Sequence, residues 1–263
     1  PALRAADIGI AMGLSGTDAA REVADMVLER DNIDAVATAV VEGRAAYRNL
    51  KRALRYFVAI HFSDVLLTVG AGAMASRTNW GALRPVQISP LRDLAPGLSL
   101  LMEPAKPGID LERPRDRDEP LLSRRDLKGL FAESAVLAGG GLAALAYGVA
   151  RYGPGVRAAT LAYQTLAAGK VVHALTCRPL STGSGPFSPP PANPLLKTIL
   201  SVLLAAQIGV QLLPGVRGLL NVAPLTALDI ATVGFTAWST HLLNRSMRKT
   251  RQGVSTPEGP TSL

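Results

Sequence analysis

The chain has 263 residues, of which 48% are hydrophobic, and it carries a formal net charge of +8 at pH 7. Its single cysteine, Cys177, excludes a disulfide framework within the chain and a thiolate metal cluster. The basic excess does not indicate nucleic-acid binding, because the sequence contains no patch in which basic and aromatic residues are interleaved.

The first 50 residues are polar and charged, and their pattern predicts a short α/β segment. "ADIGIAMG" (6–13) is typical of a short buried strand, and "SGTDAAREVADMVLE" (15–29) predicts a turn, a helix capped near Thr17 or Asp18, and a second strand. The helical periodicity of "NIDAVATAVVEGRAAYRNLKRALRYFVAIHF" then continues into the first apolar run, which predicts one continuous helix. Fifty residues are too few for a doubly wound domain, so we expect this segment to be part of a longer one.

The hydrophobic residues are concentrated in six runs, each near the roughly 20 residues that cross a hydrocarbon core. We therefore predict a mainly α membrane protein with a six-helix transmembrane bundle over residues 51–250, after the α/β segment of residues 1–50. Residues 251–263 are polar and predict a disordered tail. The six predicted spans are about 53–76, 84–102, 130–150, 156–176, 195–213 and 224–243.

The basic residues are distributed unequally between the loops that these spans would separate. With the N-terminus in the cytoplasm, 17 Lys and Arg residues lie on the inner side and five on the outer side. Positive charge accumulates on the cytoplasmic side of membrane proteins, so this distribution predicts that both termini are cytoplasmic.

Ionisable side chains within the predicted spans are candidates for a functional site, because a charge at membrane depth is costly. His61 and Asp64 are three positions apart in the first span, and Thr68 follows four positions later on the same helical face. Ser89 and Asp93 are four positions apart and share a face of the second span.

The second span also contains two prolines, in "ISPLRDLAPGLSLLMEP" (88–104). Each proline lacks an N–H group, so we expect Pro90 to free the carbonyl of Val86 and Pro96 to free that of Arg92. Freed carbonyls at membrane depth are tolerated where protein or water covers them, and they are suitable ligands for a hard cation. We therefore predict a cation or proton site, in which a divalent metal ion would be held by Asp64 and Asp93. Its predicted ion-binding residues are Asp93, Asp64, Ser89, His61 and the Val86 carbonyl.

An ordered set of motifs resembles the P-type cation ATPases, most closely the calcium-type pumps. "PALRAADIGIAMGLSGTDAAREVADMVLERDN" is similar to the end of their HAD-like phosphorylation domain, and "EGRAAYRNLKRALRY" to the stalk of their fifth membrane helix. "RPRDRDEPLLSRRDL" resembles their loop between helices six and seven, and "ANPLLKTILSVLLAAQ" the start of helix nine. The resemblance implies that the spans are helices five to ten and that the α/β segment is a remnant of the phosphorylation domain.

The resemblance also implies which functional parts lie elsewhere. The phosphorylated Asp of the DKTGT motif, the nucleotide-binding and actuator domains and helices one to four have no counterpart in this sequence, so no catalytic residue is assigned to it. ATP and Mg²⁺ would be the cofactors of the full-length pump, and the missing N-terminal part and the lipid bilayer would be the partners of this chain. The chain by itself is expected to be inactive, and the implied location is the plasma membrane.

The sequence departs from the family's pattern at the ion site. His61 and Asp64 stand where the family has Asn and Glu, and Ser89, Arg92 and Asp93 match its NxxTD motif. Arg92 replaces a threonine ligand, and Lys170 stands where two-site calcium pumps have a ligating Glu. These two fixed cations are expected to tune the charge of the site and to repel a second divalent ion. One divalent ion or protons remain as the cargo.

Other interpretations stay open at this point. The chain is alternatively a non-catalytic membrane scaffold or a truncated gene product; a secondary transporter is disfavoured because no internal repeat is found. Pairs such as Asp64 with Lys170, or Arg92 with Asp93, would be purely structural under the scaffold interpretation. Glu133 and Asp229 lie near the ends of predicted spans, where we expect them to be solvated.

Overall fold

The computed structural model describes residues 1–74, 89–104, 119–178 and 192–253. The described residues form two compact units. We call residues 1–47 the N-terminal unit, and residues 48–104 together with the described residues from 119 onward the helical unit.

The N-terminal unit contains a small parallel sheet, as the sequence predicts. Its described elements are α1 (Ala2–Ala5), β1 (Ile10–Met12), α2 (Asp18–Val23) and β2 (Met26–Leu28), and Ala11 of β1 lies opposite Val27 of β2. The Thr17 hydroxyl accepts a hydrogen bond from the Ala20 N–H and caps α2. The prediction of a buried first strand is only partly correct, because Ala11 is buried but its neighbours in β1 are half-buried. Whether this unit is the remnant of a phosphorylation domain stays a prediction.

The continuous helix predicted between the α/β segment and the first span is confirmed. It is α3 (Asp34–Met74), which has 41 residues and begins in the N-terminal unit. At 1.5 Å per residue such a helix is about 60 Å long, twice the thickness of a hydrocarbon core. The part of α3 that carries His61 and Asp64 belongs to the helical unit.

The other helices of the helical unit follow the predicted spans with shifted ends. They are α4 (Ser89–Leu101), α5 (Arg124–Tyr152), α6 (Val156–Cys177), α7 (Pro194–Leu212), α8 (Pro214–Leu220) and α9 (Ala227–Gly253). The sequence did not predict the short α8, and α9 continues three residues into the tail that was expected to be disordered from residue 251. The rest of that tail lies outside the described residues.

Among the described residues, three helices are long and apolar enough to cross a membrane by length and composition, namely α3, α5 and α7. The other three predicted spans are helical, but the described α4 has only 13 residues, and α6 and α9 do not reach the same criterion. Polar residues inside α6 and α9, such as the buried Lys170 and Asn244, explain this shortfall. The chain is therefore a helical membrane protein, and the full six-span bundle stays a prediction.

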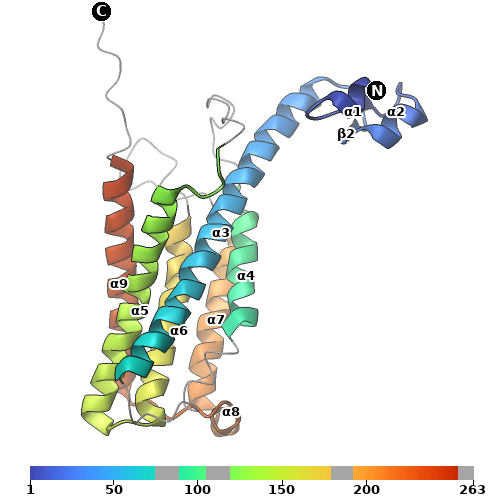
Figure 1. Cartoon of the computed structure of the whole chain (residues 1–263). Helices are drawn as coiled ribbons and strands as arrows, with labels where there is room; N and C mark the ends of the chain where they lie inside the picture. The colour runs from blue at the N-terminus through green and yellow to red at the C-terminus, as the bar shows by residue number, and fades with distance from the viewer. Residues whose placement is uncertain (75–88, 105–118, 179–191, 254–263) are drawn as a thin grey trace, which may run out of the picture. The chain divides into compact units, whose positions relative to one another are not determined.

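The core of the helical unit is formed around α6, most of which is buried. Figure 1 shows α5, α6 and α9 running side by side, and these three helices contact one another along their lengths. Gly148 of α5 allows the closest approach, since a Cβ atom there would lie 2.7 Å from the Ala158 Cα atom of α6. Small residues at such crossings are typical of helix packing in membranes. A second cluster joins α6 to α3, α4 and α7 around Tyr56, Leu100 and Leu196.

Candidate ion site

Only one of the two prolines of α4 can be assessed within the described residues. Pro90 is the second described residue of α4, and the carbonyl that its N–H would have reached belongs to the preceding turn. The predicted release of the Val86 carbonyl falls on a residue outside the described ones. Pro96 lies inside α4, so it provides no N–H group for the Arg92 carbonyl, as predicted. The helix that carries Asp93 thus continues through Pro96 but lacks one hydrogen bond about one turn after Asp93.

The centre of the candidate site is the ammonium group of Lys170 on α6. Its Nζ atom lies 2.7 Å from Asp64 Oδ2 on α3 and 2.7 Å from Asp93 Oδ2 on α4. Lys170 and Asp93 are buried, whereas 18% of the Asp64 side chain is exposed. Charge-assisted hydrogen bonds of this kind are about twice as strong as neutral ones. One buried cation therefore joins three helices that are far apart in the sequence.

The second fixed cation of the site, Arg92, lies beside Asp93 rather than between the two carboxylates. Its Nε atom is 3.8 Å from Asp93 Oδ1, and its Nη1 atom donates a hydrogen bond of 3.2 Å to the Tyr163 hydroxyl. The guanidinium carbon also lies 5.6 Å from the centre of the Tyr163 ring, within the range of a cation–π contact. Arg92 thus adds positive charge to the site from the α4 side while it contacts α6.

The remaining predicted residues lie around Asp64 to different extents. His61 Nδ1 is 3.9 Å from Asp64 Oδ2, but its ring is half-exposed and stacks on Phe57. The Thr68 hydroxyl donates to the Asp64 carbonyl, so this donor is satisfied within α3. Asp64 Oδ1 is buried and has no hydrogen-bond partner among the described residues, which leaves one carboxylate oxygen for an additional ligand. Ser89 begins α4, but its side-chain contacts lie outside what the structure describes, as does Val86.

The structure thus brings together Asp64, Asp93, Lys170 and Arg92, with His61 at the edge. Within the described part of the chain, no group of three or more His, Cys, Asp or Glu residues is arranged to hold a metal ion. The ammonium group of Lys170 occupies the place between the two carboxylates where a bridging divalent ion would bind. Two acidic and two basic side chains give the site a formal charge near zero.

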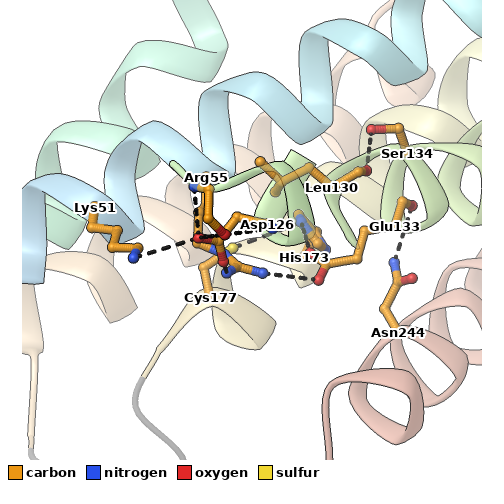
Figure 2. A network of polar contacts seen from close by, with 10 residues as sticks. Lys51, Arg55, Asp126, Leu130, Glu133, Ser134, His173, Cys177 and Asn244 are labelled. Carbon is orange, nitrogen blue, oxygen red and sulfur yellow. Dashed lines mark hydrogen bonds and ion pairs between the residues drawn. The ribbon is translucent and has the colours of Figure 1, made fainter. Parts of the chain in front are cut away.

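The expectation that Glu133 is solvated is wrong. Its side chain is 1% exposed, and it lies in the polar network of Figure 2 between α3, α5, α6 and α9. Arg55 Nη2 is 3.4 Å from Glu133 Oε1, while Arg55 Nη1 donates to Asp126 at 2.8 Å. His173 Nε2 lies 3.7 Å from Glu133 Oε2, and Asn244 Nδ2 lies 3.4 Å from the Glu133 carbonyl oxygen. Hydropathy places Glu133 correctly near a span end, but its partners come from other helices and leave no local signal in the sequence.

The expectation that Asp229 is solvated is also wrong, since its side chain is fully buried. The Tyr152 hydroxyl donates to Asp229 Oδ1 at 2.9 Å, and the Thr226 N–H donates to Oδ2 at 2.9 Å. Arg157 Nη2 lies 3.4 Å from the same Oδ2 atom and its guanidinium carbon lies 3.9 Å from the centre of the Tyr152 ring. This cluster joins the end of α5, the start of α6 and the start of α9.

Comparison with known proteins identifies the family of the chain. A family model described as "Cation transporting ATPase, C-terminus" matches residues 87–249, which is more than half of the chain. The chain belongs to this family. The resemblance to P-type cation ATPases is thereby confirmed for the C-terminal region, whereas the calcium type is not.

Individual relatives extend the match toward the N-terminus. The cation-transporting ATPase pma1 of Synechocystis sp. is 29% identical over 235 residues, which are 86% of this chain and 25% of the relative. The calcium-transporting ATPase 1 of Bacillus cereus is 37% identical over 127 residues, covering 47% of this chain and 14% of the relative. The human plasma membrane calcium-transporting ATPase 3 is 30% identical over 134 residues, covering 51% and 11%. The chain thus spans a quarter or less of the length of these relatives.

Proposed function

We propose that the chain supplies the ion-binding helices and the coupling stalk of an ATP-driven cation pump. The pairing of Lys170 with Asp64 and Asp93 carries this proposal, because it places charged groups from three helices together in the interior of a membrane protein. Intramembrane ionisable groups are rare and mark ion or proton pathways. ATP and Mg²⁺ would act in the remaining part of the pump, which would also provide the phosphorylated aspartate and helices one to four.

We further propose that the pump moves a single charge per site, with a proton as the favoured cargo. A proton bound by Asp64 or Asp93 would break one of the two ion pairs of Lys170, and the released ammonium would then repel any second cation. Return of the ammonium to the deprotonated carboxylate would neutralise the empty site. Lys170 would thus act as a tethered counter-cation, and Arg92 would be a second fixed positive charge beside Asp93.

A single divalent cation is the second candidate, and the names of two of the relatives favour it, because both are calcium-transporting ATPases. A calcium ion prefers six to eight oxygen ligands. To reach Asp64 and Asp93 it would have to displace the Lys170 ammonium from between them. The Asp64 Oδ1 atom, which has no partner among the described residues, is an oxygen ligand for either cargo.

The test is ATP hydrolysis by the whole pump in proteoliposomes, measured against calcium concentration and against pH. Asp93→Asn should abolish ion-stimulated turnover, Asp64→Asn should weaken it severely, and Ser89→Ala only modestly. Lys170→Ala should shift the pH optimum if the cargo is a proton, whereas Lys197→Ala, which alters an exposed lysine on α7, should not. Unchanged cation dependence in Asp93→Asn would refute the proposed site, and a wild-type pump without cation-stimulated hydrolysis would refute the proposed function.

A further inference from the structure

Another buried carboxylate, Glu103, lies two residues after the end of α4. Its side chain is fully buried, and its Oε1 atom accepts hydrogen bonds from Arg178 Nε at 2.9 Å and Arg178 Nη2 at 2.7 Å. Its Oε2 atom accepts a hydrogen bond of 2.7 Å from Asn193 Nδ2. Arg178 caps the end of α6, and Asn193 caps the start of α7 through a bond from the Leu196 N–H to its Oδ1 atom. Glu103 therefore ties α4 to both of these helices.

The backbone around Glu103 is held as firmly as its side chain. Asn49 Nδ2 on α3 donates to the Leu101 carbonyl at 3.0 Å and to the Glu103 carbonyl at 2.6 Å. Asn193 Nδ2 also donates to the Ser99 carbonyl at 3.1 Å. The last carbonyls of a helix lack partners one turn further on, so the Asn49 amide satisfies the Leu101 carbonyl, and the Asn193 amide adds a second donor to the Ser99 carbonyl, which also accepts from the Met102 N–H. The end of α4 is thereby fixed to α3 and α7.

The Glu103 cluster joins the same helices that hold the charges of the candidate ion site. Asp64 lies on α3, Asp93 on α4 and Lys170 on α6. Asp93 and Glu103 are ten positions apart, which corresponds to about 15 Å along a helix. Pro96 lies between them and removes one hydrogen bond of α4, so the position of Asp93 depends in part on how the following turns are anchored.

We propose that Glu103 is a positioning residue, which fixes the position of α4 along its axis and its rotation about that axis so that Asp93 contacts Lys170. This inference rests on the proposed function, since it assigns Glu103 a role in cation affinity. Loss of the Glu103 carboxylate would let α4, which Pro96 weakens by one hydrogen bond, move relative to α6. The distance between Asp93 and the Lys170 ammonium would then vary, and the site would lose affinity for its cargo.

Asp229 provides a matched control for this proposal. It is also a fully buried carboxylate paired with an arginine, but its contacts among the described residues come from α5, α6 and α9 and the turn before α9, and not from α3 or α4. Neutralising either acid leaves a partly exposed arginine without its anion and removes buried hydrogen bonds, so both changes should lower stability. A purely structural role for Glu103 would therefore make the two variants behave alike.

The experiment compares Glu103→Gln and Asp229→Asn in the whole pump, with two readouts. Thermal unfolding should occur at a lower temperature in both variants. In Glu103→Gln, the cation concentration or proton activity that half-saturates ATP hydrolysis should rise about tenfold, which is the scale expected for loss of one charge-assisted hydrogen bond. In Asp229→Asn, the same half-saturating value should stay within about twofold of the wild-type value.

A second variant covers the case in which Glu103→Gln does not accumulate. Asn49→Ala removes the bonds from α3 to the end of α4 without leaving a buried charge, and it should raise the half-saturating value in the same direction. The positioning role would be overturned if the half-saturating value of Glu103→Gln equalled that of Asp229→Asn. If Glu103→Gln does not accumulate, the same comparison is made with Asn49→Ala. Absence of cation-stimulated hydrolysis in the wild-type pump would instead overturn the proposed function, and this inference with it.

Discussion

Replacement of Lys170 by methionine is the sharpest perturbation of the candidate site. Methionine keeps most of the side-chain volume but removes the ammonium that lies 2.7 Å from both Asp64 Oδ2 and Asp93 Oδ2. Two carboxylates would then face each other in the interior without the cation that joins them. Removing one partner of a buried ion pair costs about 3–5 kcal/mol.

This cost can be measured as a change in unfolding temperature. For a chain of this size, each kcal/mol corresponds to about 2–4 °C, so Lys170→Met should unfold roughly 6–20 °C below the wild type. Lys197→Met is the control, because Lys197 is exposed on α7 and such substitutions usually change stability by no more than about 0.5 kcal/mol. The assay is thermal unfolding of the purified chain in detergent micelles, together with its yield in the membrane fraction.

A compensating variant separates loss of the ion pairs from loss of packing. Lys170→Met combined with Asp64→Asn and Asp93→Asn removes the three charges of the Lys170 pairs, so no carboxylate is left buried without its cation, and the remaining Arg92 is partly exposed and keeps its bond to Tyr163. This triple variant should therefore recover most of the lost unfolding temperature. A Lys170→Met chain that unfolds within about 1 °C of Lys197→Met would contradict the inference that the ammonium joins the two carboxylates.

Three other outcomes are expected. A cysteine placed at position 80 should be labelled from outside and one at position 116 from inside, because the Lys and Arg distribution predicts cytoplasmic termini; labelling of position 116 from outside would contradict the topology. Gly148→Ala should lower the free energy of unfolding by about 1–3 kcal/mol, because the new Cβ atom would lie 2.7 Å from the Ala158 Cα atom. Gly139→Ala is the control and should not destabilise α5, because no atom lies within 4 Å of its new Cβ atom. Equal unfolding temperatures of the two variants would argue against the close crossing of α5 and α6. The purified 263-residue chain should not hydrolyse ATP, as measured by phosphate release, and any hydrolysis that withstands further purification would show that it carries a catalytic site of its own.

The sequence predicts the members of the candidate site better than it predicts their geometry. Charge within an apolar run identifies Asp64, Asp93 and Lys170, because such residues are rare at membrane depth. Which acid pairs with Lys170 depends on how α3 and α4 lie against α6, and no local pattern contains that information. The structure shows that Lys170 pairs with both acids, which neither of the separate pairings considered from the sequence anticipated.

The incorrect predictions have a common physical cause. Hydropathy reports the depth of a residue along its own helix, so Glu133 and Asp229 were correctly placed near span ends. Whether such a residue meets water depends on the neighbouring helices, and here those helices supply Arg55 and Arg157 and cover both carboxylates. Glu103 was missed for the same reason, since its main partner Arg178 is 75 positions away.

The placement of the buried charges indicates which contacts hold α6 to each of its neighbouring helices. Acidic side chains on α4, α5 and α9 each pair with a basic residue from another helix, and α6 takes part in every one of these clusters, through Arg178, His173, Lys170 and Arg157. The Asp229 cluster and the close approach of α5 to α6 fix α6 against its neighbours without involving α3 or α4. The ion-site carboxylates, in contrast, belong to α3 and α4. A conformational change that moves α3 and α4 relative to α6 would have to break the pairs of Lys170 with Asp64 and Asp93, and also the Arg178–Glu103 and Arg92–Tyr163 bonds.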